Sequence, residues 1–170
     1  MRIFRGQVPQ IAAQLVSELT ADGAVEVHSE EEVRMDLEAV LKEFSRRDRQ
    51  ISEEARDRLE REGLSRTMLG RVMARVDKER GFPPRDERLP YLVEQVMTML
   101  FHSNNVDDIF AEDHILRKAI TKVLRANSGM ESELDAEVRN KIKNLTEGTA
   151  SFDIEYNKVM EQIKSKRRMD

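Results

Sequence analysis

The sequence contains no cysteine and no tryptophan. Disulfide frameworks, thiolate nucleophiles and Cys-ligated zinc are excluded, because each of them needs a cysteine sulfur. Aromatic residues make up only 5% of the chain, which argues against a stacking platform for single-stranded nucleic acid. The seven glycines are isolated, and none forms the glycine-rich loop that holds a phosphate at a helix N-terminus.

Long apolar segments are also missing. No apolar run approaches the roughly 20 residues that a membrane-spanning helix needs, and the first ten residues, MRIFRGQVPQ, lack the apolar core of a signal peptide. We therefore expect a cytoplasmic protein with no membrane partner. The formal net charge is −4, and neither half of the chain has the basic excess that is typical of a dedicated nucleic-acid-binding protein.

Motifs for catalysis or metal binding are equally scarce. His28, His102 and His114 have neighbouring carboxylates or a serine, but adjacent residues on a helix point to different faces, so these groups do not converge. The acidic residues between Asp107 and Asp113 lack the alternating ligands and the central glycine of a calcium loop, and they indicate a helix start instead. We expect solvated histidines, no enzymatic activity, no cofactor and no metal site.

What the sequence does contain is helical periodicity. Apolar residues recur at steps of three and four, and they predict four helices in the first half, over residues 7–20, 29–49, 52–63 and 65–80. Ser29 and Glu32 form a capping-box pattern, and Ser52 followed by two glutamates predicts another helix start. Residues 25–27 are expected to be extended, as is the Gly-Phe-Pro-Pro segment, because two consecutive prolines do not continue a helix.

The second half repeats this order. Shifting the apolar positions of the four helices by 81, 83, 83 and 87 residues places them on apolar positions of the second half, and Pro9 corresponds to Pro90. The predicted fold class is all-α: two tandem, internally duplicated four-helix units that form a two-lobed or pseudo-symmetric helical bundle. The predicted division is a first unit at 1–80, a Pro-rich linker at 81–88 and a second unit at 89–170. Separate cores and one shared core both remain open, as does the oligomeric state.

Two basic clusters are candidate contact sites for a partner. They consist of Arg46, Arg47 and Arg49, and of Lys164, Lys166, Arg167 and Arg168. Both clusters close predicted helices, where the helix dipole stabilises cations by about 0.3–1 kcal/mol without any partner. The leading hypothesis is a non-enzymatic protein-interaction or scaffold module. The alternative is a nucleic-acid-associated protein that uses these clusters to contact phosphates.

Three segments carry a resemblance to a known family. They read MRIFRGQVPQIAAQLVSEL at the start, EVRMDLEAVLKEFSRRDRQISEEARDRLEREGL in the middle and FAEDHILRKAITKVLR in the second half. In order and content they resemble the five-hundred-and-seventh of the bacterial families of domains of unknown function, over essentially the whole chain. The resemblance implies a small, helical, cytoplasmic bacterial protein. It implies no reaction, cofactor or site residue.

Overall fold

The computed structural model describes residues 1–167, apart from the side chains of residues 130–132. This part of the chain is mostly helical, in agreement with the all-α class. Its helices are α1 (Val8–Thr20), α2 (Glu30–Arg61), α3 (Leu69–Glu79), α4 (Arg88–His102), α5 (Asp113–Ser128), α6 (Met130–Lys141) and α7 (Ala150–Lys166). Two short strands, β1 (Val25–Val27) and β2 (Val106–Ile109), and short 3-10 turns complete it.

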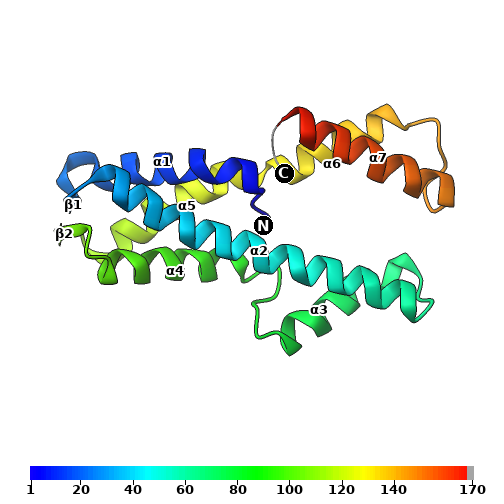
Figure 1. Ribbon diagram of the computed structural model, residues 1–170, viewed down its shortest axis with the longest axis horizontal. Coiled ribbons are helices and arrows are strands. Elements are labelled where there is room, and N and C mark those ends of the chain that lie inside the picture. The colour runs from blue at the N-terminus through cyan, green and yellow to red at the C-terminus, as the bar shows by residue number, and fades with distance from the viewer. Residues whose placement is uncertain (168–170) are drawn as a thin grey trace.

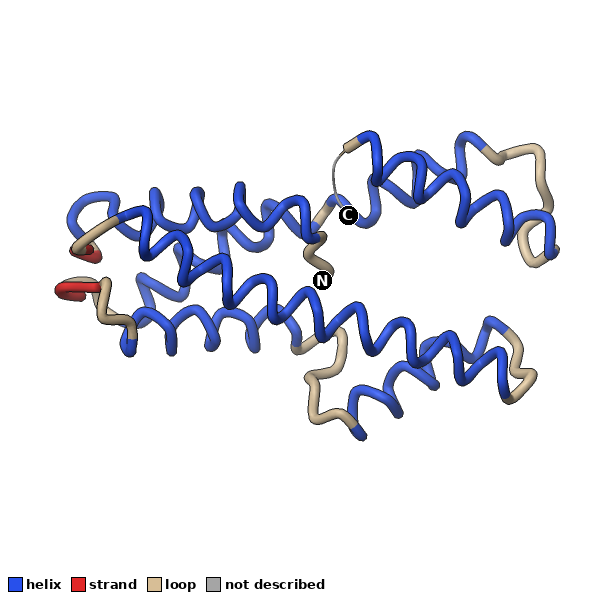
Figure 2. The backbone as a smooth tube through the Cα atoms, viewed as in Figure 1, coloured by secondary structure: helices blue, strands red, loops and turns tan. Residues whose placement is uncertain are grey.

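The helices form a body from which two arms extend (Figures 1 and 2). Helices α1, α4 and α5 and the first half of α2 lie side by side in the body. The second half of α2 packs on α3 and makes the first arm, while α6 packs on α7 and makes the second arm. The two strands lie at the opposite end of the body, which we call the sheet end, and the N-terminus lies where the arms begin.

Local sequence signals explain how the body helices begin and end. Pro9 stands in the first turn of α1, where its missing N–H costs no hydrogen bond, and the predicted stripe from Ile11 to Leu19 is buried. After this helix, Asp22 and Gly23 adopt positive φ angles of 54° and 71°. Helix α2 starts as predicted, because the Ser29 hydroxyl accepts a hydrogen bond from the backbone N–H of Glu32 at 3.3 Å.

One prediction about α2 is wrong. The two helices expected at 29–49 and 52–63 are a single helix of 32 residues. Ser52 is not a helix cap, since its hydroxyl donates to the Asp48 carbonyl one turn earlier, at 2.9 Å. The helix runs on because its buried stripe keeps one helical phase throughout: Val33, Leu37, Leu41, Phe44, Asp48, Ile51, Ala55 and Leu59.

The main hydrophobic core contains residues from both sides of the predicted linker. Leu15, Leu37, Leu92 and Leu124, each at most 1% exposed, belong to this one cluster together with apolar residues of the first arm. The second arm has a cluster of its own, which the N-terminal Phe4 joins. The division into units 1–80 and 89–170 stays a prediction. Residues from both sides of the predicted linker hold the body together.

The two strands pair antiparallel at the sheet end, with Val25 opposite Ile109 and Val27 opposite Val106. The extended segment expected at 25–27 is therefore confirmed. Residues 106–109 correct the prediction that the acidic run begins a helix: Asp107 and Asp108 lie in β2, and only the later part of the run caps and opens α5. Pairing with β1 gives backbone groups of this segment hydrogen-bond partners, which the first N–H groups of a helix would lack.

Candidate functional site

A buried ionic cluster fixes the place where the first arm leaves the body. The Arg88 guanidinium, in the first turn of α4, is 2% exposed and forms ion pairs with Asp48 of α2 and Asp77 of α3. Its distance to the Asp77 carboxylate is 2.8 Å, and its Nε donates to the Pro83 carbonyl at 3.3 Å. A buried cation needs such partners, because removal from water is costly. One arginine thus joins three helices and the linker.

The Gly-Phe-Pro-Pro linker is docked against α2. Phe82 is only 4% exposed and packs against Phe44 and Tyr91, with ring centroids 5.5 and 5.7 Å away. The Arg47 guanidinium lies 4.8 Å from the Phe82 ring centroid and donates to the carbonyls of residues 80 and 81, both at 3.2 Å. Arg47 therefore holds the linker in place.

Three adjoining cavities open between the arms, and together we call them the arm cleft. Their volumes are about 400, 340 and 130 Å³, and all three are lined by Arg2 and Arg56. The largest also contacts Arg85 of the linker and Tyr156 and Lys164 of α7. The cleft is thus assembled from the N-terminus, α2, the linker and the second arm, and two of its three cavities fall in the size range typical of ligand pockets.

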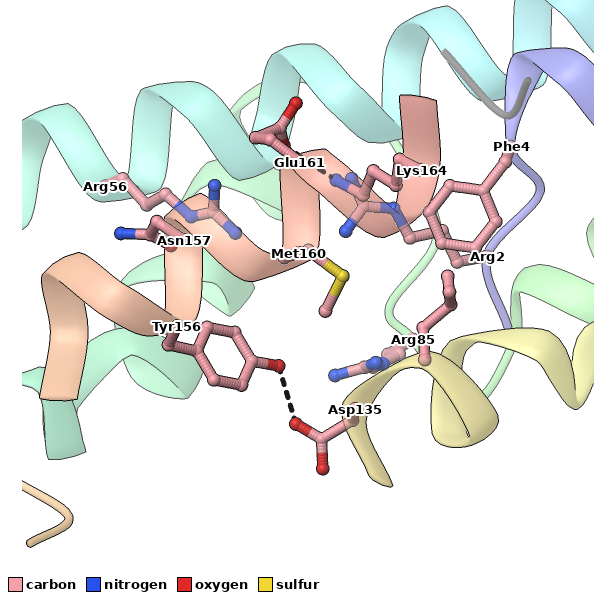
Figure 3. Close-up of a pocket in the computed structure, with 11 residues that line it drawn as sticks. Arg2, Phe4, Arg56, Arg85, Asp135, Tyr156, Asn157, Met160, Glu161 and Lys164 are labelled. Carbon is pink, nitrogen blue, oxygen red and sulfur yellow. Dashed lines mark hydrogen bonds and ion pairs between the residues drawn. The ribbon is translucent and has the colours of Figure 1, made fainter. Parts of the chain in front are cut away.

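Both apolar and polar groups line the largest cavity of the cleft (Figure 3). Phe4, Leu134 and Met160 line it as apolar groups, and the first two belong to the core of the second arm. The Tyr156 hydroxyl donates to the Asp135 carboxylate at 2.6 Å, which ties α7 to α6 beside the cavity. A ligand here would contact apolar surface and charged groups at the same time.

The cations of the cleft differ in how they are paired. The Lys164 ammonium lies 3.1 Å from the Glu161 carboxylate and 5.8 Å from the Phe4 ring centroid. Arg2 lies 3.9 Å from the buried Asp48. Arg56 is exposed, and within the described residues it forms neither an ion pair nor a hydrogen bond. Arg56 is therefore available to an incoming anionic group.

An ion pair joins the two arms far from the body. Arg66, in the 3-10 turn Arg66–Met68 that precedes α3, forms an ion pair with Asp153 in the first turn of α7. The loop between α2 and α3, which holds this turn, and the first turn of α7 lie at the outer ends of the two arms (Figure 1). The arm cleft is thus bordered by the N-terminal segment on one side and by this ion pair on the other.

The predicted contact residues are separated by the fold. Arg49 and Lys164 both line the arm cleft, whereas Arg46 and Arg47 line a separate hollow on another face of α2. Lys166 and Arg167 are exposed at the end of α7, and Arg168 lies outside the described residues. As contact sites, all of these residues remain predictions.

The explanation offered for the first cluster is wrong, because Arg46, Arg47 and Arg49 lie in the middle of α2 and not at its C-terminus. Neighbours on the same helix stabilise two of them instead. Arg46 pairs with Glu43 at 2.7 Å, and Arg49 pairs with Glu53 at 2.8 Å. The hydrogen bond from Arg46 lowers the pKa of the Glu43 carboxyl below its ordinary value.

Apart from Arg49 and Lys164, the basic residues that meet in the cleft were not predicted from the sequence. Arg2, Arg56 and Arg85 belong to no basic run, and each lies on a different segment. No local pattern brings them together, because their proximity depends on how the arms and the N-terminus pack. The shift of 83 residues that aligns the third predicted helix also places Arg56 on Arg139, but this match does not indicate where Arg56 lies in the fold.

The histidines lie at the other end of the molecule. His28, His102 and His114 are all exposed, as predicted, and they flank the two strands at the sheet end. Within the described residues, histidine and carboxylate side chains form no group of three or more that could hold a metal ion. No helix in the same part of the chain combines the length and the apolar content needed to cross a bilayer.

These features define a mostly helical protein with a charged cleft between two helical arms. Its family follows from comparison with known proteins. The chain belongs to the family described as "Protein of unknown function (DUF507)", whose model matches residues 1–169, and this confirms the resemblance found in the three sequence segments. A comparison with curated proteins found no match.

Proposed function

We propose that this chain is a non-enzymatic, cytoplasmic protein-interaction module that receives a segment of its partner in the arm cleft. The observation that carries the proposal is the cleft itself, where four segments far apart in the sequence line adjoining cavities. Cavities of this kind occur where packed elements diverge, and they bind ligands through apolar surface and a few polar groups.

The chemistry of the lining supports binding more than catalysis. Arginine dominates it, and an arginine side chain stays protonated in proteins, so it anchors anionic groups without exchanging protons. Two of the lining carboxylates, Glu53 and Glu161, are engaged in ion pairs with Arg49 and Lys164. Such groups are suited to recognition by charge and shape.

We also propose that the two halves of the chain arose by internal duplication. The order of a helix, a strand and further helices runs from α1 to α3 and again from α4 to α7. Pro9 and Pro90 occupy the first turns of α1 and α4, and the two strands pair with each other. The first arm would then correspond to the second, with α2 matching α5 and α6 together.

A site-specific cross-link tests the binding proposal. A photo-reactive amino acid would replace Asn157, an exposed residue of α7 that lines the largest cavity of the arm cleft. Asn140, an exposed asparagine of α6 outside the cavities described above, is the matched control in the same arm. In lysate of the source organism, we expect one stoichiometric protein to cross-link from position 157 and not from position 140. Equal labelling at both positions, or none at 157, would contradict the proposal.

A further inference from the structure

The arm cleft carries an excess of positive charge. Seven basic residues line its three cavities, against four acidic residues: Arg2, Arg5, Arg49, Arg56, Arg85, Arg88 and Lys164 against Asp48, Glu53, Asp135 and Glu161. Each of the acidic residues already has a cation or hydroxyl partner in the protein. The surplus therefore resides on arginines such as Arg5 and Arg56, both of which are exposed.

This surplus is local, because the chain as a whole has a net charge of −4. The opposite end of the molecule is acidic: Glu30, Glu31 and Glu32 open α2, and Asp107 and Asp108 lie in β2. The negative charge of the sheet end and the positive charge of the cleft are thus separated along the length of the body. A partner with a negative segment would be attracted to the cleft end only.

Apolar surface in the cleft adds a second requirement. Tyr156 and Met160 are only partly buried, and they line the largest cavity of the cleft beside the buried Phe4 and Leu134. Figure 3 shows Arg2, Arg56 and Arg85 around these groups. An occupant that presents an apolar side chain between acidic ones would satisfy both kinds of surface. Amphipathic helices offer such a pattern at steps of three and four residues.

We propose that the arm cleft binds an acidic, amphipathic segment of a partner protein. Its carboxylates pair with Arg2, Arg56 and Arg85, and an apolar side chain packs on Tyr156 and Met160. This inference rests on the proposed function, to which it adds the chemistry of the partner. A nucleic acid fits less well, because its backbone carries phosphates but no apolar side chain that could pack on Met160 and Leu134.

Fluorescent peptides of fifteen residues test the inference on the full chain. All three probes have leucine at the same positions, at helical spacing. The remaining positions are all glutamate in the first probe, all glutamine in the second and all lysine in the third. Fluorescence anisotropy at about 50 mM salt should show binding of the glutamate peptide only, and added salt should weaken it. Equal binding of the glutamine peptide would overturn the inference, because charge would then play no part.

Variants of one arginine locate the site. Arg56→Glu is expected to weaken binding of the glutamate peptide by about tenfold or more, while Arg56→Lys keeps most of it. Arg125→Glu is the matched control, since Arg125 is also exposed, lies on a helix of the body and has no ion pair within the described residues. The same loss in Arg56→Glu and Arg125→Glu would show that only net charge matters, and it would overturn the site.

Two further outcomes separate this inference from the proposed function. A cross-link at position 157 to a partner segment without acidic residues would leave the interaction module standing and overturn its acidic partner. A fifteen-nucleotide oligothymidylate that binds more tightly than the glutamate peptide, and is weakened by Arg56→Glu, would assign the cleft to nucleic acid and overturn the inference as well.

Discussion

The two arms are attached to the same body in different ways. Helix α2 enters the first arm without a break, and the apolar residues of this arm belong to the main core. The second arm follows a break at Gly129 between α5 and α6, and its apolar residues form a separate cluster that Phe4 joins. One arm is thus an extension of the body, and the other is a small unit held by a few contacts. The comparison predicts different responses to substitution.

The largest difference in stability between substitutions in the two arms should appear at the buried ionic cluster of Arg88. Arg88→Met would leave the carboxylates of Asp48 and Asp77 buried without their shared cation, and we expect the free energy of unfolding to fall by about 3–5 kcal/mol. Arg139→Met is the control in the second arm, where the pairs with Asp135 and Glu147 are exposed, and it should cost about 0–1 kcal/mol. Urea denaturation measures both. Similar losses would show that the buried ions do not hold the first arm.

Apolar truncations should separate global from local unfolding. Leu37→Ala in the body and Leu134→Ala in the second arm each remove a fully buried side chain, and such changes cost about 2–5 kcal/mol. Hydrogen exchange should speed up throughout the body for Leu37→Ala, but only between residues 130 and 166 for Leu134→Ala. Leu124→Ala, in α5, is the control and should behave like Leu37→Ala. Body-wide exchange in Leu134→Ala would contradict a separately held second arm.

The junction between α5 and α6, where the second arm begins, should be easy to stabilise. Gly129 has φ −72° and ψ −17°, a right-handed helical conformation, and an added Cβ would meet no atom within 4 Å. Gly129→Ala is therefore expected to stabilise the fold by about 0.4–1 kcal/mol, since it restricts the unfolded chain. Gly63→Ala in the first arm is the contrasting case, because its φ of +62° is unfavourable for alanine by about 1–2 kcal/mol. Thermal denaturation measures both, and a destabilised Gly129→Ala would contradict the helical geometry.

The smallest expected effect is a loss of stability at low pH, which comes from ion pairs on the surface of the first arm. Hydrogen bonds from Arg58 lower the pKa values of Glu54 and Glu79 below their ordinary 4.5. The stabilisation from these carboxylates is therefore present above about pH 4.5 and is lost as the pH falls through the lowered pKa values. NMR titration should give midpoints below 4.5 that rise in Arg58→Met. Arg71→Met, which removes an exposed arginine of α3, should leave both midpoints unchanged.

Much of the fold was predictable from local patterns. The starts of α1 and α2, their buried stripes and the extended residues 25–27 follow from Pro9, Ser29 and apolar spacing. The break expected near Ser52 was not there, because a serine can serve as a cap or bond to the carbonyl one turn back. The phase of the apolar stripe, which continues through Ile51, was the better guide.

The site was less predictable, for a physical reason. Asp48 follows a basic pair in the sequence, but its main partner is Arg88, forty residues later. Arg56 and Lys164 line the same cavity although more than one hundred residues separate them. Such contacts depend on tertiary packing and leave no periodic signal in a single sequence. The first basic run contains Arg46 and Arg47, which lie outside the cleft. Arg2, Arg56 and Arg85 line the cleft although each is isolated in the sequence.

Helix α2 also connects the sheet end of the molecule with the outer end of the first arm. Its 32 residues span about 48 Å, and its first turns lie next to the strands while its last turns form the outer part of the first arm. A tilt of about 5° around its N-terminal end would move its far end by about 4 Å. The width of the arm cleft is therefore coupled to how α2 packs against α1 and α4 at the remote end of the molecule.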